Sequence, residues 1–341
     1  MTEPPKLWKH QEAGIQEALK AGNYMFAYAP GTGKTRTVIE LIKRKANEAR
    51  RLPRTLIFAP PIVLDNWRNE WFKYTQIERS RVTVLAGSGK KRLETLIEKG
   101  FPKQEYGLLL PHVFVTNYEA LLMESLFDRM MRWQPEVLIF DEAHRLANPK
   151  SKRSKLADKL ANKTTPRPLV YLLTGTPVMN SAMDIFMPFK IMDGGETFGQ
   201  NFFAFRATYF RDANAGMNKH AYFPNWKILP HAHQTLSEKM KARSMCVKKE
   251  DCLDLPPVIE QIVSVEMEQE QSRIYANLMR DYVAYFRRDE QDHAVVANMA
   301  MVKGLRLMQL ASGFIKTDQG EELPASKGWS PKQEALAEIL E

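Results

Sequence analysis

Residues 24–35 read Tyr-Met-Phe-Ala-Tyr-Ala-Pro-Gly-Thr-Gly-Lys-Thr, and this stretch decides the fold. Its first five residues form an apolar run that suits a buried strand, and the apolar positions after the stretch have the spacing of one helix face. Gly31 and Gly33 allow the backbone between them to turn tightly and to point its N–H groups inward toward an anion. The stretch therefore predicts a strand, a phosphate-binding loop and a helix.

The residues at the end of this loop have separate expected roles. Thr32 and the two glycines wrap the phosphates, the Lys34 ammonium reaches the outer phosphates, and the Thr35 hydroxyl binds magnesium. The complete phosphate-loop pattern is not met, because Tyr28 stands where its first glycine would be. The alternative interpretation is an ordinary glycine-rich turn between a strand and a helix.

Two adjacent carboxylates follow a second apolar run, Val137 to Phe140. In open parallel sheets, ligands bind at the carboxyl ends of the strands, which is where Asp141 and Glu142 are expected. Asp141 is suited to hold magnesium through water, and Glu142 to orient and deprotonate an attacking water. A solvated acidic turn is the alternative for this pair alone. Together with the phosphate loop, the pair predicts a nucleoside triphosphatase.

Apolar runs recur along the first half of the chain and alternate with helical patterns. Such alternation predicts an α/β fold in which helices cover both faces of a parallel sheet. From about 185 to 240 aromatic residues crowd together, which indicates the core of a helical protrusion more than a base-stacking platform. The expected strands are 24–28, 55–59, 82–85, 112–116, 136–140 and 169–173.

The end of the chain is expected to be helical. Leu253 to Pro257 is interpreted as a linker that two prolines stiffen. Residues 293–314 predict an apolar helix rich in methionine, which is interpreted as bundle core or, alternatively, as a surface for a partner. Before it, four residues repeat with the spacing of an amphipathic helix: Tyr275, Met279, Tyr282 and Phe286.

Asp-Glu-Ala-His, at its distance from Gly-Thr-Gly-Lys-Thr, resembles the superfamily-two, DEAH-box helicases and translocases. Further segments resemble the motifs of that superfamily in the expected order. They are 7–14 with Gln11 (the adenine-reading motif), 56–60 with Trp67 and Glu70 (motif Ia), 113–119 (motif Ib) and 173–177 (motif III). Segments 174–209, 243–257, 268–275 and 304–309 are similar to the Swi/Snf-type branch, although Val247-Lys248 stands in place of that branch's paired arginines.

The resemblance implies a RecA-like P-loop fold and ATP-driven movement along double-stranded DNA without strand separation. It also implies roles for individual residues. ATP is expected at Gln11, Gly31, Thr32, Gly33, Lys34 and Thr35, with Mg2+ at Thr35 and Asp141 and catalysis by Lys34, Asp141 and Glu142. Nucleic acid is expected at Pro60, Thr116, Asn117 and Tyr118, and coupling between the two sites at Thr174, Gly175 and Thr176.

The resemblance divides the chain into parts of a two-lobed motor. Residues 1–250 are expected to form the first, ATP-binding lobe, with the protrusion at about 185–240. Residues 251–257 would be the inter-lobe linker, and 258–341 the helical start of a second lobe whose core is absent. The motifs of that second lobe are not found, and the chain stops within a helical pattern, which suggests an artificial or split boundary.

A second RecA-like lobe, in cis or in trans, is therefore expected as a partner. It would supply arginines that stabilise the transferring phosphoryl group, a contribution worth about 10³ to 10⁵ in rate. By itself the chain is expected to be nearly inactive. Two other functions remain as alternatives, a catalytically silent nucleic-acid or protein-binding module and an RNA helicase. The intact Lys34, Thr35, Asp141 and Glu142 disfavour the first, and segments 198–209 and 243–257 disfavour the second.

Charge and composition bound the remaining possibilities. The net charge is +9, and between Arg145 and Arg167 eight basic residues face one acid. This run is either a solvated helix face or a surface that follows nucleic-acid phosphates. Cys246 and Cys252 are too few for a zinc site or a disulfide framework, which indicates a reduced compartment.

Membrane and targeting signals complete the sequence-based expectations. No apolar run reaches the length of a membrane span, and the N-terminus has no signal-peptide pattern. No membrane association and no zinc are therefore expected. The predicted location is cytoplasmic and nucleoid-associated, and the lean layout favours a bacterial or viral source over a nuclear one.

Overall fold

A computed structural model of the chain describes two compact units, Met1–Leu255 and Pro256–Glu341. The described residues are 5–101, 109–175, 181–215, 224–252, 261–281, 283–288, 291–296, 300–316, 322–325 and 328–340. The expected linker, Leu253 to Pro257, lies outside them. Each unit has a hydrophobic core of its own.

The first unit contains a seven-stranded sheet in the order β3-β4-β2-β5-β6-β1-β9, and every pairing in it is parallel. Six of its strands were predicted from apolar runs. The seventh, β9, was not predicted, because its short apolar segment is flanked by Arg243 and Lys248 and its residues are mostly only partly buried or exposed. The strands are β1 (Tyr24–Tyr28), β2 (Thr55–Phe58), β3 (Val82–Val84), β4 (Val113–Thr116), β5 (Val137–Asp141), β6 (Leu169–Thr174) and β9 (Ser244–Val247).

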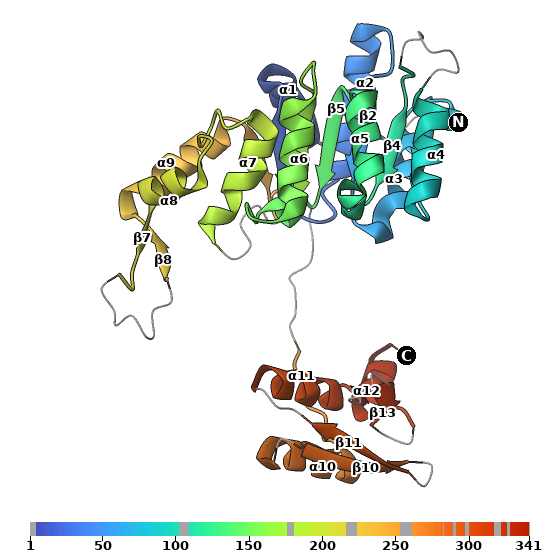
Figure 1. Ribbon diagram of the computed structural model, residues 1–341, viewed down its shortest axis with the longest axis vertical. Coiled ribbons are helices and arrows are strands. Elements are labelled where there is room, and N and C mark those ends of the chain that lie inside the picture. Colours follow the sequence, from blue (N-terminus) through green and yellow to red (C-terminus); the bar gives the residue numbers. More distant parts are fainter. Residues whose placement is uncertain are drawn as a thin grey trace. The chain divides into compact units, whose positions relative to one another are not determined.

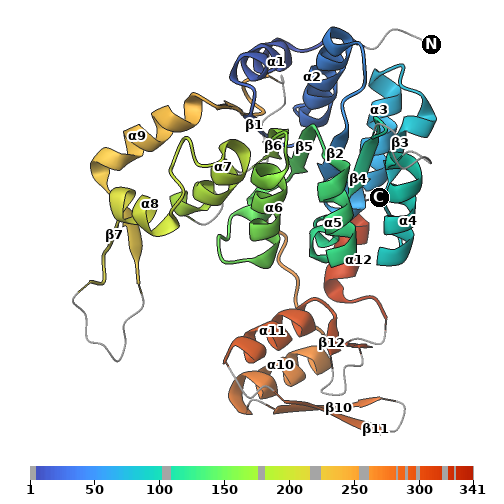
Figure 2. The same ribbon diagram turned by 45° about the horizontal axis from the view of Figure 1, so that its top comes forward.

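Helices cover both faces of this sheet (Figure 1). One face carries α1 (Lys9–Ala21), α2 (Lys34–Ala49) and α3 (Leu64–Tyr74). The other carries α4 (Gly89–Gly100), α5 (Glu124–Trp133), α6 (Lys152–Lys163) and α7 (Phe186–Asp193), and Figure 2 shows α5 and α6 side by side there. The predicted α/β fold with a RecA-like sheet is thereby confirmed.

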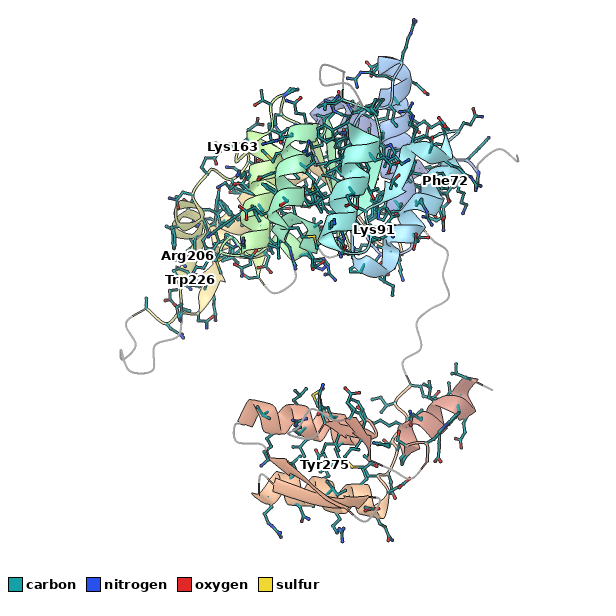
Figure 3. The ribbon with its side chains drawn as sticks, turned by 45° about the vertical axis from the view of Figure 1, so that its right-hand side comes forward. Phe72, Lys91, Lys163, Arg206, Trp226 and Tyr275 are labelled. Carbon is teal, nitrogen blue, oxygen red and sulfur yellow. The ribbon has the colours of Figure 1, made fainter. Side chains whose placement is uncertain are left out.

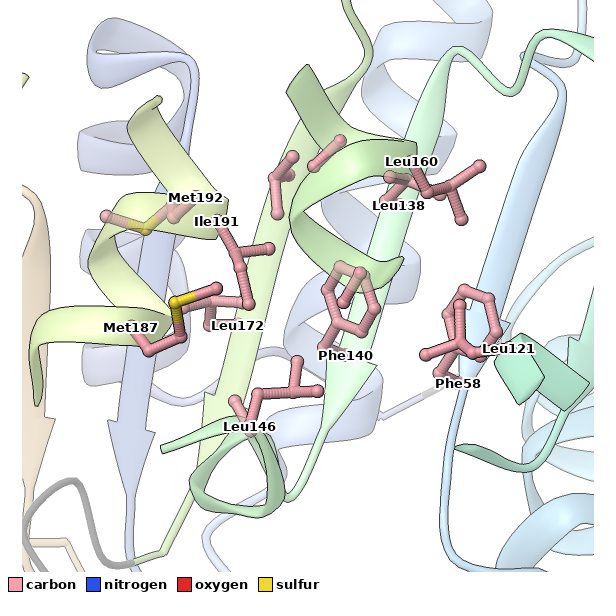
Figure 4. Packing of buried hydrophobic residues seen from close by; sticks show 14 of the residues in the cluster. Phe58, Leu121, Leu138, Phe140, Leu146, Leu160, Leu172, Met187, Ile191 and Met192 are labelled. Carbon is pink, nitrogen blue, oxygen red and sulfur yellow. The ribbon is translucent and has the colours of Figure 1, made fainter. Parts of the chain in front are cut away.

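Successive residues of the central strands enter opposite cores, since side chains alternate along a strand. Leu56 and Phe58 of β2 pack under α4 to α7, whereas Ile57 packs under α1 to α3. Figure 4 shows the first of these cores, in which the rings of Phe58 and Phe140 stack with their centroids 5.2 Å apart. Each fully buried ring of this size contributes roughly 2–3 kcal/mol. Burial on both faces explains why the strands read as continuous apolar runs.

The protrusion contains a β-hairpin as well as helices. It comprises η5 (Ala182–Ile185), α8 (Phe202–Tyr209), the paired strands β7 (Phe210–Asp212) and β8 (Trp226–Ile228), and α9 (Pro230–Lys241). Phe198 and Phe205 are buried and pack edge to face against each other, and Phe198 also packs against Phe189 of α7, which confirms the core interpretation of the aromatic cluster. The Arg206 guanidinium lies 4.0 Å from the centroid of the Trp226 ring and so ties α8 to the hairpin (Figure 3).

The second unit contains α10 (Gln269–Asp281), α11 (Ala300–Ala311), α12 (Pro331–Leu340) and two antiparallel hairpins, β10 (Val283–Arg288) with β11 (Gln291–Val296) and β12 (Phe314–Lys316) with β13 (Glu322–Pro324). The expected helix through Phe286 ends at Asp281, and the helix expected over 293–314 begins only at Ala300. Both expectations were wrong in extent, because Val-Ala-Tyr-Phe at 283–286 has the β-branched and aromatic composition of a strand. Ile274, Leu278 and Leu310 form the core.

A buried histidine makes the stability of the first unit depend on pH. His112 stacks on Phe114 with ring centroids 4.4 Å apart, and its Nε2 lies 2.9 Å from the Thr83 hydroxyl. Burial, with smaller effects from Arg81 and Lys99, lowers the pKa of His112 to about 4. An unfolded histidine titrates near 6.5. The unfolded state therefore binds more protons between these two pH values.

We expect the free energy of unfolding to fall by about 3 kcal/mol on this account as pH drops from about 6.5 to about 4. His112→Gln should remove this part of the pH dependence, and urea denaturation at several pH values measures it. His231→Gln, at an exposed position on α9, is the control. Equal pH slopes for the two variants would contradict the assignment.

Candidate active site

The loop between β1 and α2 has the backbone geometry of an anion-binding turn. Gly31 and Gly33 have φ values of 84° and 85°, in the left-handed region that glycine alone adopts readily. A Cβ atom at Gly33 would lie 2.2 Å from Nε2 of Gln11, so a larger residue cannot occupy that position without displacing the glutamine. Thr35 lies in the first turn of α2, whose N-terminus faces this loop.

The start of α1 packs against the same loop. Gln11 is buried and accepts a hydrogen bond from the Trp8 N–H (2.9 Å), and its neighbour His10 has Nε2 2.9 Å from the Thr32 carbonyl oxygen. The Thr32 hydroxyl donates to the Ala29 carbonyl oxygen (2.7 Å), so Thr32 closes the loop on itself and offers no free hydroxyl to a ligand. The adenine-reading role of Gln11 stays a prediction.

Lys34 links the loop to the acidic pair electrostatically. Its Nζ donates to the Tyr28 carbonyl oxygen (2.9 Å) at the end of β1. Burial lowers the pKa of Lys34, while the charges of Glu142 and Asp141 act in the opposite direction. The ammonium of the phosphate loop and both carboxylates therefore lie within range of one another at the carboxyl edge of the sheet.

Asp141 is the most constrained acid of the site. Its side-chain Oδ2 accepts from the Trp67 indole N–H (2.9 Å) and its Oδ1 from the backbone N–H of Glu142 (3.0 Å), while its carbonyl oxygen accepts from the Tyr118 hydroxyl (2.6 Å). Burial raises the pKa of Asp141 above its usual value, and the Trp67 hydrogen bond and Lys34 only partly oppose this. A buried carboxylate of this kind is further stabilised by a bound cation.

Glu142 has an uncommon backbone conformation. Its φ and ψ are both 53°, in the left-handed region, which costs roughly 1–3 kcal/mol for a residue other than glycine. The conformation opens the short helix η4 (Ala143–Leu146) directly after β5. Nδ1 of His144 lies 3.2 Å from a Glu142 carboxylate oxygen. The Asp-Glu-Ala-His motif contains this histidine, but the motif alone did not indicate that it lies beside Glu142.

The end of β6 lies against the phosphate loop. Thr174 is paired in register with Ala27 of β1, and a Cβ atom at Gly175 would lie 3.2 Å from Cδ of Pro30. A larger residue at position 175 would therefore press against Pro30, so glycine suits this close approach. Thr176 lies outside the described residues, and the coupling role of the three residues stays a prediction.

Comparison with known proteins identifies the family. Residues 10–311 match the family model described as "SNF2-related domain". The chain belongs to the SNF2-related family. The resemblance to Swi/Snf-type ATPases is thereby confirmed, and the chain carries a Swi/Snf-type motor domain of the helicase-like ATPase superfamily.

Relatives of this SNF2-related chain are much longer than it is. It is 24% identical over 318 residues to putative protein p41 of Acyrthosiphon pisum secondary endosymbiont phage 1, covering 91% of this chain and 63% of that one. It is 26% identical over 275 residues to chromodomain-helicase-DNA-binding protein 1-like of Danio rerio and 28% identical over 268 residues to helicase SWR1 of Saccharomyces cerevisiae. These matches cover 80% and 75% of this chain, but only 24% and 16% of the relatives.

A solved structure shares the fold of this SNF2-related chain. It is the Sulfolobus solfataricus SWI2/SNF2 ATPase core in complex with double-stranded DNA, with a TM-score of 0.56 and 20% sequence identity. The match covers 99% of this chain and 64% of that chain. At this identity the similarity shows the fold alone.

The four residues expected to contact nucleic acid differ in accessibility. Pro60 is half-buried before η1 (Pro61–Val63), and Asn117 is half-buried and accepts from the Arg92 guanidinium (2.7 Å). Thr116 and Tyr118, by contrast, are buried, because the first ends strand β4 inside the sheet and the second reaches Asp141. Their side chains are turned into the protein, so these two residues could contact a nucleic acid only through their backbone, and the nucleic-acid role of all four residues stays a prediction.

The donor set fits magnesium. The Thr35 hydroxyl and the Asp141 carboxylate are oxygen ligands, which Mg2+ prefers, and Mg2+ ordinarily keeps several waters beside one or two protein ligands. Within the described part of the chain, no group of three or more His, Cys, Asp or Glu residues could hold a metal ion by itself.

Among the described helices, none is long and apolar enough to cross a membrane.

Proposed function

We propose that this chain is the ATP-binding portion of a double-stranded DNA translocase. The observation that carries the proposal is that the Lys34 ammonium lies within electrostatic range of Asp141 and Glu142. These residues lie at the carboxyl ends of β1 and β5. A cation on a glycine-hinged loop and two acids on the neighbouring edge are the parts that phosphoryl transfer to water requires. The DNA named for the Sulfolobus structure supports duplex DNA as the partner.

The chain's own residues divide the work as follows. The loop N–H groups and the Lys34 ammonium bind and orient the outer phosphates, while the Thr35 hydroxyl and Asp141 hold the metal. Glu142 accepts the proton of the attacking water, for which its half-buried carboxylate beside Asp141 is suited. Mg2+, when bound, neutralises charge on the phosphate oxygens. Gln11, packed against Gly33, would recognise the base.

A second RecA-like lobe, in cis or in trans, completes this site in the proposal. Among the described residues, the second unit has two short antiparallel hairpins and no parallel sheet. We expect DNA-stimulated ATP turnover by the 341-residue chain to be roughly 10³- to 10⁵-fold slower than that of the two-lobed motor, since the arginines of the second lobe are needed. Steady-state phosphate release with saturating duplex DNA measures this. Brisk turnover by the chain alone would refute the requirement.

Duplex DNA is proposed to bind through its phosphates near Pro60 and Asn117, and this predicts a steep dependence on salt. If binding displaces the condensed counterions of three or four phosphates, the affinity should fall by roughly 50-fold or more as the salt concentration rises from 50 to 200 mM. Fluorescence anisotropy with two unrelated duplexes of equal length measures it, and both should give the same slope. A flat salt dependence would rule out phosphate contacts as the main source of affinity.

The same measurements separate the translocase from its alternative. If the affinity for duplex DNA falls steeply with salt but the chain binds no Mg-ATP, the chain would instead be a nucleic-acid-binding module that keeps the fold.

A DNA-bound motor also implies a location inside the cell, beside the chromosome or a viral genome.

A further inference from the structure

Two buried aromatic side chains converge on Asp141 from different segments. Trp67 comes from the second turn of α3 and donates its indole N–H to the Asp141 carboxylate at 2.9 Å. Tyr118 comes from the first residue of η3 (Tyr118–Leu122) and donates its hydroxyl to the Asp141 backbone oxygen at 2.6 Å. We call these three residues the aspartate clamp. Trp67 and Asp141 are 74 residues apart in the chain, so only the fold brings them together.

The clamp fixes the aspartate at three atoms. Oδ2 is held by Trp67, Oδ1 by the backbone N–H of Glu142, and the carbonyl oxygen by Tyr118. Trp67 and Tyr118 are each only 1% exposed, so the clamp is packed on all sides and has little room to move independently of its surroundings. A carboxylate held in this way needs no reorientation when it binds a metal, and partners of this kind typically contribute 10- to 100-fold to metal affinity.

Both aromatic donors lie close in the chain to segments proposed to face DNA. Trp67 lies one turn after η1, whose Ile62 is 91% exposed and whose Pro61 follows Pro60. Tyr118 follows Asn117, which is held by Arg92. A displacement of η1 or of the 116–118 segment must therefore move a hydrogen-bond donor of Asp141.

We propose that Trp67 and Tyr118 are positioning residues that couple DNA occupancy to the metal-binding state of Asp141. This inference rests on the proposed function and deepens it, because it assigns the route by which DNA reaches the nucleotide site. Coupling of this kind is reciprocal, so Mg-nucleotide must change DNA affinity by the same factor as DNA changes nucleotide affinity.

The chain offers matched controls for both donors. Trp71 lies one turn further along α3, is also 1% exposed, and its indole N–H has no hydrogen-bond partner among the described residues. Tyr171 of β6 is fully buried, and its hydroxyl likewise has no partner there. Trp→Phe and Tyr→Phe at these positions remove the same atoms as in the clamp, but no bond to Asp141.

The test uses the full chain and a fluorescent ATP analogue, titrated in Mg2+ or in EDTA, with and without a duplex of fixed sequence. Trp67→Phe should reduce the gain in affinity from Mg2+ by roughly tenfold or more, and Trp71→Phe by less than twofold. The change in nucleotide affinity that DNA causes should be lost in Trp67→Phe and Tyr118→Phe and kept in Trp71→Phe and Tyr171→Phe. Tyr118→Phe removes one hydroxyl oxygen and so keeps the test decisive if Trp67→Phe does not fold.

The outcomes distinguish a failure of the coupling route from a failure of the proposed function. Equal behaviour of each clamp variant and its control, with the Mg2+ gain intact in the wild type, would overturn the coupling route and leave the proposed function standing. A rise in Mg2+-dependent affinity in Trp67→Phe would overturn it as well. A wild-type chain with no Mg2+-dependent gain would overturn the proposed function, and the clamp with it.

Discussion

Replacing Lys34 by alanine should lower the affinity of the chain for Mg-ATP by about 100-fold, since truncating one partner of a buried charge pair costs 2–5 kcal/mol. The ammonium donates to the Tyr28 carbonyl oxygen and lies within electrostatic range of both acids. Because this ammonium is already partly buried, it can donate hydrogen bonds to a bound phosphate chain without a further cation having to be buried. The alanine variant would leave the phosphates facing Asp141 and Glu142 without the ammonium, so that only the metal ion would offset their charge.

Isothermal titration with ATP and a non-hydrolysable analogue measures this loss. Lys45→Ala is the matched control, because Lys45 lies on the same helix but away from the loop. Both variants should melt at similar temperatures. An unchanged affinity in Lys34→Ala would mean that the loop is an ordinary turn and would remove the basis of the proposed function.

Glu142→Gln should separate binding from turnover. Glutamine keeps the size of the side chain but cannot accept a proton, so the rate of hydrolysis should fall by roughly 10²- to 10⁴-fold. The affinity for Mg-ATP should stay within a few-fold of the wild type, because Asp141 and Thr35 hold the metal in the proposal. The decay of bound ATP under single-turnover conditions is a suitable readout, because the chain's own rate is expected to be low.

Glu124→Gln, at an exposed position on α5, controls for the loss of a surface charge. If Glu142→Gln and Glu124→Gln hydrolyse ATP at the same rate, Glu142 is not the general base. A parallel loss of affinity and rate in Glu142→Gln would instead assign it to ligand binding.

Central strands could be predicted from the sequence because burial on both faces leaves an unmistakable apolar run. Strand β9 has no such run: only Val247 is fully buried, and its place beside β1 depends on pairing with a segment more than two hundred positions away in the printed sequence. In the second unit, Tyr275 and Met279 lie in α10 as their spacing predicted, whereas Phe286 belongs to the hairpin strand β10 and Tyr282 lies outside the described residues. Periodicity alone does not decide between helix and strand for short segments.

Motif order located the candidate site but not the direction of its side chains. Asp141, Glu142 and Lys34 could be named from spacing, because their roles require a fixed place on the strand and loop. Tyr118 was expected near the nucleic acid, and the motif did not indicate that its hydroxyl reaches inward to the Asp141 carbonyl oxygen. Trp67 was noted only as part of a motif, and its bond to Asp141 could not be read from a linear pattern.

Strand β9 has a mechanical consequence. It joins β1 along its whole length, and its Val247 carbonyl oxygen accepts from the N–H of Ala29, the residue that opens the phosphate loop. Tension on the chain beyond Cys252 would therefore load these bonds in shear, and the strand that feeds the nucleotide-binding turn would carry that load. A force that pulls on the chain where it leaves the first unit would therefore act directly on the phosphate loop.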